Sequence, residues 1–484
     1  MKLLLASSEV YPYSKTGGLA DMVGGLAKTL ARLGHEVGLV TPFYAGIREQ
    51  FPGLQRLDYF LEVPLGSGRV KGEVWTLQPA ERLTIYFVDQ PGYFHRSGLY
   101  QQFGVDYPDN AQRFIFFAKA VGHLGLHLSW RPELVHLHDW QTGLTAVFLD
   151  QQRQTLGAQG RVPRTCVTLH NIAYQGVFAA AQFACANLPW SYFSSRGLEF
   201  YGRFNCLKGG IAYADVLTTV SPRYAREITT EEFGCGLDGL LRERLSKLTG
   251  ILNGVDYGEW NTNANPHLKH PFSVADPGGK AINKAELQQE LGLPVRADIP
   301  LFISIGRLVE QKGVDILAAG LEEMLPAQMQ FALLGSGESR FEGAFQQLAK
   351  RFPDRAVVRI GFDEGLSHRL EAGGDFFLMP SKFEPCGLNQ MYSLRYGTVP
   401  VVRATGGLDD TVIDIKDDAQ NANGIKFSEY SGEALAHAIR KALALYAGSD
   451  LLAHYRRNGM SADFSWDRTA AAYEAVYRRA LGGA

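Results

Sequence analysis

The stretch FFLMPSKFEPCGLNQMYSLRYG, residues 376–397, places an acid, a proline, a cysteine and a glycine in four consecutive positions, Glu384 to Gly387. An apolar run precedes these four residues and a helix-like pattern follows them, which predicts a strand, a turn and a helix. Three roles are open to the turn: Cys386 as a nucleophile, Glu384 as a catalytic carboxylate, or polar residues that only form the turn.

The helix after this turn is predicted to end at Gly397, a C-terminal cap, and Pro385 fits its first turn. Glu384 would then lie at the helix start, where the helix dipole favours the ionised carboxylate. Such a carboxylate suits binding of sugar hydroxyls better than acid catalysis at neutral pH. The same position would make Cys386 reactive, but no Cys–His pairing is visible in the sequence, so a thiol nucleophile is the minor alternative.

Two cations follow another apolar run, in PLFISIGRLVEQKG (300–313). Arg307 is predicted at the end of the strand, and Lys312 lies just before a helix that starts near Gly313. A guanidinium, an ammonium and helix N–H groups at one place suit a pyrophosphate. The alternative is a pair of solvated surface charges. Another predicted strand is followed by Thr405, Gly406 and Gly407. The backbone amides of these residues could also face a phosphate.

The first loop of the chain, SKTGGLAD (14–21), has a similar composition. Gly17 and Gly18 allow the backbone to approach a ligand, the helix that begins near Leu19 directs N–H groups there, and Lys15 adds a cation. The alternative is an ordinary turn with a surface lysine. Neither G-x-G-x-x-G nor a Walker-A motif occurs, which disfavours a dinucleotide-dependent dehydrogenase and a P-loop NTPase.

Histidines end two further strands. His136 and His138 in LVHLHDWQTG would share one face of a strand, so they could chelate a metal, but no further ligands lie nearby in the sequence. We prefer Asp139 and Trp140 as polar and stacking groups that face a cleft. His170 and Asn171 end the strand of TCVTLHN.

The elements that must position these residues are short, continuously apolar runs separated by helical stretches. Such runs are typical of parallel strands buried on both faces, and their repetition predicts two doubly wound α/β domains. Ligands of such sheets bind at the carboxyl ends of the strands. The predicted strands are 2–8, 36–42, 83–89, 134–139, 165–171, 215–221, 248–254, 300–306, 330–335, 356–361, 375–381 and 399–404. The aperiodic segment 261–280 is the best candidate for the boundary.

Composition excludes several classes of protein. Lys+Arg 48 against Asp+Glu 50 leaves a net charge of −2, without the basic surface of a nucleic-acid or anionic-membrane binder. Five scattered cysteines disfavour a disulfide framework or a structural zinc site. No apolar run is long enough to span a membrane. The amino-terminal sequence predicts a first strand rather than a signal or transit peptide, and hence a cytoplasmic protein.

Several motifs together resemble the family of bacterial glycogen synthases and plant starch synthases, from residue 1 to about residue 480. They are SKTGGLAD, HLHDW, LHNIAYQG, LPWSYF, GLEFYG, LKGGIAYAD, TTVSPRYAREI, ILNGVD, SIGRLVEQKG, PSKFEPCGLNQMYSLRYGTVP, TGGLDDTV and DFSW. The resemblance implies a GT-B fold: two Rossmann-like domains, 1–255 on the acceptor side and 256–460 on the donor side, facing a central cleft. A helix in 461–484 would cross back to the first domain.

The resemblance also implies an activity, the retaining transfer of glucose from ADP-glucose to the non-reducing 4-OH of glycogen or another α-1,4-glucan. No metal or other cofactor is implied, and no nucleic acid or membrane partner. The alternatives are another retaining GT-B transferase, of the sucrose or trehalose type or dependent on UDP-glucose, and a non-catalytic protein that binds glucans or nucleotide sugars.

The family's site residues map onto positions of this sequence. Arg307 and Lys312 resemble the cations on the diphosphate, Glu384 the acid at the donor glucose, and His170 the histidine whose backbone carbonyl faces the anomeric carbon. The remaining positions implied for the donor phosphate loop or the sugar cleft are Lys15, Gly17, Gly18, Asp21, Tyr100, Asp139, Trp140, Asn171, Asn253, Cys386, Gly387, Leu388, Thr405, Gly406 and Gly407.

Two positions depart from the family pattern. Tyr392 occupies the place of a second glutamate that often contacts the ribose of the donor, which puts that contact in doubt. Asn389 stands where bacterial members commonly carry threonine; it keeps a hydrogen-bonding side chain but changes its reach.

Overall fold

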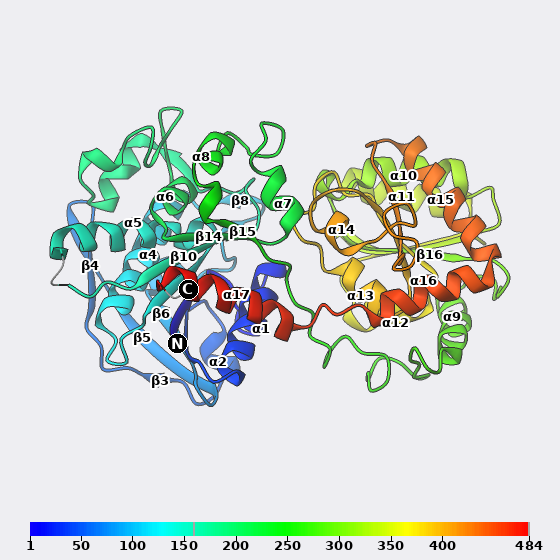
Figure 1. Cartoon of the computed structure of the whole chain (residues 1–484), viewed down its shortest axis with the longest axis horizontal. Coiled ribbons are helices and arrows are strands. Elements are labelled where there is room, and N and C mark those ends of the chain that lie inside the picture. The colour runs from blue at the N-terminus through cyan, green and yellow to red at the C-terminus, as the bar shows by residue number, and fades with distance from the viewer. Residues whose placement is uncertain (158–159, 483–484) are drawn as a thin grey trace. The chain divides into compact units, whose positions relative to one another are not determined.

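The apolar runs of the sequence form the strands of two largely parallel sheets, one in each of two units of the chain. A computed structural model describes residues 1–157 and 160–482. Unit 1 comprises residues 1–220, 225–254 and the chain from Trp466 on; unit 2 comprises 221–224 and 255–465 (Figure 1). The sequence predicts domain boundaries after residue 255 and after residue 460. In the structure, the chain leaves unit 1 after Gly254 and returns to it at Trp466.

Unit 1 contains a 10-stranded sheet with the order β15-β14-β10-β9-β1-β2-β6-β5-β3, in which β4 pairs with β5. The strands from β15 to β6 are parallel neighbours, as predicted; β3, β4 and β5 extend the sheet antiparallel. The strands are β1 (Lys2–Ala6), β2 (Glu36–Pro42), β3 (Gln55–Arg56), β4 (Leu61–Leu65), β5 (Gly68–Ala80), β6 (Leu83–Asp89), β9 (Leu134–His138), β10 (Arg164–Leu169), β14 (Val216–Thr219) and β15 (Leu248–Gly250).

The antiparallel extension was not predicted, because β5 carries many polar, partly exposed residues and has no continuous apolar run. Smaller pairings are β7 (Gln101–Gln102) with β8 (Val105–Asp106), and β11 (Val177–Ala179) and β12 (Glu199–Phe200) with β13 (Arg203–Asn205). The helices of unit 1 are α1 (Gly18–Arg32), α2 (Ile47–Gln50), α3 (Pro91–Phe94), α4 (Asn110–His127), α5 (Asp139–Leu156), η2 (Ala180–Ala186), η3 (Trp190–Tyr192), α6 (Cys206–Tyr213), α7 (Pro222–Glu227, which begins in unit 2), α8 (Asp238–Glu243), η4 (Leu245–Lys247) and α17 (Trp466–Ala480).

Unit 2 is a 6-stranded parallel sheet with the order β18-β17-β16-β19-β20-β21. Its strands are β16 (Leu301–Leu308), β17 (Gln330–Gly337), β18 (Ala356–Ile360), β19 (Phe376–Met379), β20 (Val399–Arg403) and β21 (Ile425–Phe427). Its helices are α9 (Gly278–Leu291), η5 (Glu310–Lys312), α10 (Val314–Met324), α11 (Ser339–Arg351), α12 (Glu364–Gly373), α13 (Asn389–Arg395), α14 (Gly406–Thr411), α15 (Gly432–Ala447) and α16 (Ser449–Ser461).

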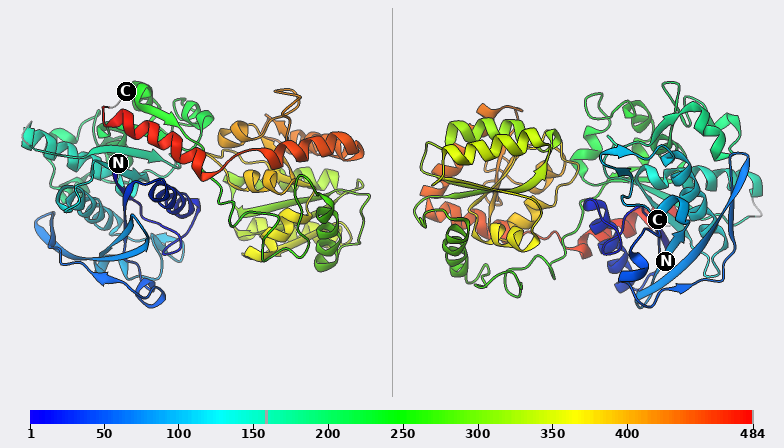
Figure 2. Two further views of the ribbon diagram at one scale, coloured as in Figure 1. Left: turned by 60° about the horizontal axis from the view of Figure 1, so that its bottom comes forward. Right: turned by 180° about the vertical axis from the view of Figure 1, so that it is seen from behind.

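Helices cover both faces of the unit 2 sheet (Figure 2). Successive strand residues point to opposite faces. Phe302 packs in a core with α10, α11 and α15, whereas its neighbour Ile303 packs in a second core with α9 and α12. The continuous apolar runs therefore arise from burial on both faces, as the sequence predicted.

The chain's last helix, α17, packs within unit 1, where it lies beside α1 (Figures 1 and 2). The Trp466 ring lies so close to Gly25 and Gly254 that a Cβ at either glycine would come within 2.4 or 2.5 Å of ring atoms. Further along the helix, the Tyr477 hydroxyl lies 2.8 Å from Nδ1 of buried His136. These contacts fix the helix at both ends.

The aperiodic segment 261–280 is part of unit 2 rather than a loose connection. Phe272 is buried with Tyr396, and the Asn265 side chain donates hydrogen bonds to the backbone and to the Tyr396 hydroxyl. No helix in the described part of the chain is long and apolar enough to cross a membrane.

Candidate active site

In unit 1 the predicted site residues other than Tyr100 and Asn253 follow three neighbouring parallel strands, β1, β9 and β10. Parallel pairing brings the carboxyl ends of these strands to one edge of the sheet. Asp139 follows β9 directly and His170 follows β10 directly, and the Asp139 Oδ1 atom accepts a hydrogen bond of 2.7 Å from the His170 backbone N–H. The Asn171 backbone N–H is a second hydrogen-bond donor to this carboxylate.

Asp139 is the first residue of α5 and has a φ of 57°, which a non-glycine residue rarely adopts. Backbone strain of this kind is retained where the surrounding structure requires it, often at functional sites. Here the strained backbone directs the carboxylate to the two N–H groups after β10. Burial of the carboxyl group raises its pKa to about 7, against the lowering effect of those hydrogen bonds.

We expect the stability of the protein to depend on the ionisation of Asp139 between about pH 4 and pH 7. An unfolded aspartate has a pKa of about 3.9, so in this window the folded protein holds a proton that the unfolded chain has released. The stabilising contribution is complete below the unfolded pKa and is lost as the pH rises through the folded pKa. The free energy of unfolding should fall by up to about 1.4 kcal/mol per pH unit from this group alone.

Asp139→Asn tests this expectation, because asparagine keeps an oxygen for the backbone N–H groups but does not titrate. Urea denaturation at a series of pH values should show this contribution to the slope in the wild type and not in the variant. If the free energy of unfolding changed with pH equally in the wild type and in Asp139→Asn between about pH 4 and pH 7, the carboxylate would be ionised in the folded protein and the expectation would be wrong.

Two histidines next to Asp139 contact each other: His138, which precedes Asp139 in the chain, has its Nδ1 atom 2.9 Å from His170 Nε2. Burial lowers the pKa of His170 to about 3 and that of His138 well below its usual value, so both rings are neutral. One proton therefore lies between His138 Nδ1 and His170 Nε2. His138 Nε2 is buried with no partner among the described residues. We assign the shared proton to His138 Nδ1, since an orphaned acceptor is more common than an orphaned N–H; His170 then carries its own proton on Nδ1.

The metal interpretation of His136, His138 and Asp139 is not supported. The ring centroids of the two histidines lie 4.1 Å apart, on one face of β9 as expected. Both His136 nitrogens, however, have protein partners: Nε2 lies 2.6 Å from the Thr168 hydroxyl and Nδ1 contacts Tyr477. His136 therefore connects the sheet to α17.

Glu9 organises the first loop, a role that the sequence analysis missed. Its buried carboxylate accepts hydrogen bonds from the backbone N–H groups of Thr16 and Gly17, from the Thr16 hydroxyl and from the Tyr100 hydroxyl at 2.7 Å. Burial raises the pKa of Tyr100 well above its usual value, so this phenol remains a neutral donor. A carboxylate placed three residues after a strand was the available signal.

The predicted phosphate loop is exposed at Lys15, Gly17 and Gly18. Lys15 Nζ lies 2.8 Å from an Asp21 carboxylate oxygen on α1, so the two predicted site residues pair with each other. Gly17 has a φ of −160°, an extended conformation open to any residue, and a Cβ there would meet no atom within 4 Å. The glycine leaves open space in front of α1 instead of relieving strain.

Other predicted positions in unit 1 have mainly structural surroundings. The Trp140 ring packs edge-on against Phe114 at 4.9 Å and against Phe178 at 5.7 Å. These contacts pack the partly buried Trp140 ring within unit 1, and stacking of a ligand on this ring stays a prediction. The Asn171 side chain accepts a hydrogen bond from the Ala173 N–H. Asn253 is buried, and its side-chain oxygen has no partner among the described residues.

In unit 2 the central contact joins two predicted residues. Lys312 Nζ lies 2.6 Å from Glu384 Oε2, and the Ser381 hydroxyl donates to the same oxygen at 3.0 Å. The Glu384 side chain is 7% exposed and that of Lys312 is 25% exposed. Buried charges are stable in proteins when they are paired and hydrogen-bonded, as this pair is. Because both donors that the described residues offer to this carboxylate bind Oε2, Oε1 is the oxygen available to a ligand hydroxyl.

The predicted start of the helix after this turn was wrong. Helix α13 begins at Asn389, five residues after Glu384, and Gly387 has a φ of 72°, which interrupts helical geometry. Neither Pro385 nor Cys386 lies in a helical first turn, so the dipole does not stabilise Glu384 or activate the thiol; Lys312 and Ser381 hold the carboxylate. The predicted cap is confirmed, because Gly397 has a φ of 65° just after the helix.

The glycines of α14 have a packing role. A Cβ at Gly406 would lie 2.0 Å from the Glu384 carbonyl oxygen, and one at Gly407 would lie 2.0 Å from that of Cys386. The Gly407 N–H donates to the carbonyl oxygens of Glu384 and Pro385, so it does not face a phosphate as predicted. Close approach of α14 to the 384–387 turn thus explains these glycines.

The remaining predicted residues of unit 2 lie in different local surroundings. Arg307 is exposed within β16, one residue before the strand ends. Tyr392 stacks on Trp260 at 3.7 Å with an interplanar angle of 3°. Asn389 donates to the Ile305 carbonyl oxygen at 2.8 Å, so it ties α13 to β16. Leu388 and Thr405 are the N-cap residues of α13 and α14, and Cys386 is buried.

Comparison with known proteins identifies the class first. Residues 2–243 match the family described as "Starch synthase catalytic domain", and residues 286–461 match "Glycosyl transferases group 1". The structure of the catalytic domain of starch synthase IV from Arabidopsis thaliana, bound to ADP and acarbose, has a TM-score of 0.89 and 34% identity, with 99% of each chain covered. Sucrose-phosphate synthase from Thermosynechococcus elongatus, at 18% identity and a TM-score of 0.64, shares the fold. The chain is a glycosyltransferase of the GT-B fold.

Curated relatives then identify the family. Glycogen synthase of Anaeromyxobacter sp. (strain Fw109-5) is 49% identical over 480 residues, which cover 99% of both chains. Glycogen synthase 1 of Geobacter sulfurreducens is 43% identical over 487 residues, covering 99% of this chain and 96% of the relative. The chain belongs to the glycogen synthase family, as the resemblance implied, and its function is that of a glycogen synthase.

Proposed function

We propose that the protein transfers glucose from ADP-glucose to the non-reducing 4-OH of an α-1,4-glucan, with retention of configuration and without a metal or other cofactor. The observation that carries the choice of donor is the ADP bound to starch synthase IV, which is similar to this chain over 99% of its length. The acarbose in that structure supports an oligosaccharide acceptor. A cytoplasmic location belongs to the same proposal.

The unit 2 residues suit departure of a diphosphate. The Lys312 ammonium uses one of its three donors on Glu384 and keeps two for phosphate oxygens. The exposed Arg307 guanidinium adds paired N–H donors that can bind a second phosphate. The negative charge that develops on the leaving ADP would meet these two cations, which is electrostatic stabilisation of the transition state without a metal ion.

The carboxylate beside these cations suits binding rather than nucleophilic attack. A retaining mechanism with two carboxylates forms a covalent intermediate on one of them. Oε2 of Glu384 is bound to Lys312 and Ser381, which holds the side chain in the turn and leaves Oε1 for a sugar hydroxyl. We therefore propose that the acceptor hydroxyl attacks from the face that ADP leaves, while Glu384 holds the donor glucose.

A side-by-side assay of donors tests the proposal. With a glycogen primer and a metal chelator present, we expect release of ADP from ADP-glucose at a rate at least about tenfold above release of UDP from UDP-glucose, with elongation of the glycogen. Sucrose- or trehalose-type transfer would instead require a small acceptor. Preference for UDP-glucose, elongation of a small sugar only, or loss of activity on chelation would each contradict a part of the proposal. Donor binding without turnover would indicate a non-catalytic protein.

A further inference from the structure

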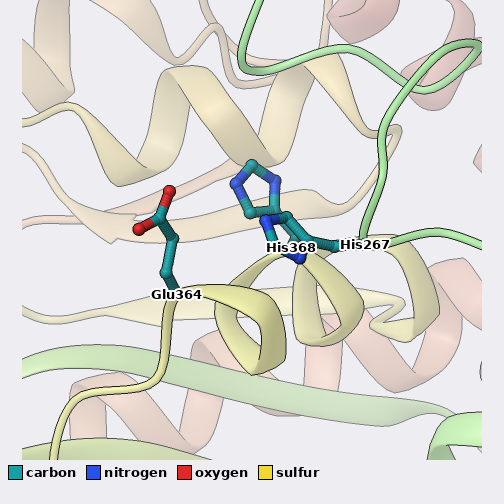
Figure 3. Close-up of side chains that lie close together, drawn as sticks. All are labelled: His267, Glu364 and His368. Atoms are coloured by element: carbon teal, nitrogen blue, oxygen red, sulfur yellow. The ribbon is translucent and has the colours of Figure 1, made fainter.

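Three potential metal ligands lie together in unit 2, at the start of α12. Glu364 and His368 are one helical turn apart and so lie on the same face of this helix. His267 comes from the segment between Val255 and Pro277, which contains no helix or strand. One ligand atom from each of the three side chains lies within 4.8 Å of the other two (Figure 3).

Each of the three side chains has at least one ligand atom that no hydrogen bond or ion pair occupies in the described part of the chain, which for His368 is Nε2. The nearby charges already have partners or caps: Arg369 forms two hydrogen bonds of 2.8 Å with Glu290, and Asp363 caps α12 by accepting from the Leu366 N–H. The Glu364 carboxylate forms no hydrogen bond or ion pair with a described residue, and neither do the ring nitrogens of His267.

The protein holds His368 in one orientation. Its ring is 1% exposed and stacks on Trp260 at 4.1 Å. When Nε2 coordinates an ion, Nδ1 carries the proton and donates it to the Tyr396 hydroxyl 2.9 Å away, and this hydroxyl also accepts from Asn265 Nδ2. Histidine ligands commonly have their second nitrogen hydrogen-bonded in this way.

Asn265 connects the two histidines. Its side-chain oxygen accepts a hydrogen bond of 2.9 Å from the backbone N–H of His267, while its Nδ2 donates to the Tyr396 hydroxyl, which is the acceptor for His368 Nδ1. The backbone of one ligand and the ring of the other are therefore positioned by one side chain. This arrangement gives the cluster a supporting layer of contacts that isolated surface histidines lack.

The ligand set indicates the class of ion. Two imidazole nitrogens and one carboxylate oxygen suit zinc and similar transition metals, whereas magnesium and calcium prefer oxygen ligands alone. In a tetrahedral zinc site the ligand atoms lie about 3.3 Å apart, so binding must draw the three side chains together. The two imidazole planes are within 21° of parallel, with centroids 5.0 Å apart, so the His267 ring must also turn. Its partly exposed position permits this movement.

We propose that His267, Glu364 and His368 bind one divalent transition-metal ion of the zinc class, with water as the fourth ligand. The ion would fasten the segment 255–277 to α12. Its role is structural, and the proposed transfer of glucose does not pass through it.

The test uses the full chain, freed of metal with a chelator and dialysed at neutral pH. Titration with Co²⁺ should give the visible absorption of a four-coordinate site at one ion per chain, and Zn²⁺ should displace it. Saturating Zn²⁺ should raise Tm by about 2 °C or more, and Mg²⁺ should not. His267→Ala and Glu364→Gln, both at positions outside the core, should each weaken Zn²⁺ binding at least about tenfold and abolish the rise in Tm.

Helix α15 offers a matched control, because Glu433 and His437 have the same spacing and are exposed, but belong to no three-ligand group among the described residues. The double variant Glu433→Gln/His437→Ala should bind one Zn²⁺ as the wild type does. Absence of stoichiometric binding would overturn the proposal. So would unchanged binding in His267→Ala, or equal loss in the α15 control.

Discussion

Replacement of Arg307 by alanine is expected to lower kcat by about 10²–10³-fold, because the variant loses one of the two cations proposed to stabilise the departing diphosphate. Arg307 is exposed on β16, so its removal should leave the fold intact. The fall in kcat should exceed any rise in KM, since charge develops on the leaving group mainly in the transition state. Steady-state release of ADP at saturating glycogen measures both constants.

Lys312→Ala should show a loss of similar size with an additional effect on stability. Its ammonium is the partner of the buried Glu384 carboxylate, so the variant leaves that charge without its cation. Lys350→Ala on α11, an exposed lysine elsewhere in unit 2, is the matched control and should retain wild-type activity. If Arg307→Ala and Lys312→Ala both kept kcat near that of the wild type, the proposed stabilisation of the leaving group would be wrong.

Glu384→Ala is expected to lower kcat/KM by about 10²-fold or more, because the donor glucose loses its proposed hydroxyl acceptor and Lys312 loses the contact that holds it. The free energy of unfolding of unit 2 should also fall, by about 1–3 kcal/mol, since the Ser381 hydroxyl and Lys312 both lose their acceptor. Kinetics with ADP-glucose and urea denaturation give the two values.

Cys386→Ser provides the comparison within the same turn. The thiol is buried and lies in no helical first turn, so a helix dipole does not activate it as a nucleophile. Serine is close in size, and the variant should keep most of its activity. A variant pair with the opposite behaviour, an inactive Cys386→Ser and an active Glu384→Ala, would place the thiol at the centre of the reaction.

The strands could be predicted from the sequence because their signal is local. Each predicted apolar run coincides with a strand of one of the two sheets, since burial on both faces requires continuous hydrophobicity. The same reasoning could not find β5, whose antiparallel pairing on the outer part of the unit 1 sheet leaves polar side chains partly exposed. The rule that ligands bind at strand ends also selected Asp139, His170 and Lys312 without the structure.

The 384–387 turn shows where local patterns fail. Proline followed by a helix-like sequence predicts a helix start at Pro385, yet the positive φ of Gly387 delays the helix to Asn389. What holds Glu384 is a lysine 72 residues earlier in the chain. Glycines 406 and 407, which had the pattern of a phosphate loop, are explained by contact with the backbone of this same turn.

The sequence by itself determined the two-unit α/β architecture, the family, and the strand ends at which polar residues gather, because periodicity and motif order are properties of neighbouring residues. Only the tertiary structure decided which of those residues pair. The pairs Glu9 with Tyr100, His138 with His170, Lys312 with Glu384, and His267 with α12 join segments that are distant in the chain. Such partnerships depend on sheet order and on the close approach of loops, and no local pattern encodes them.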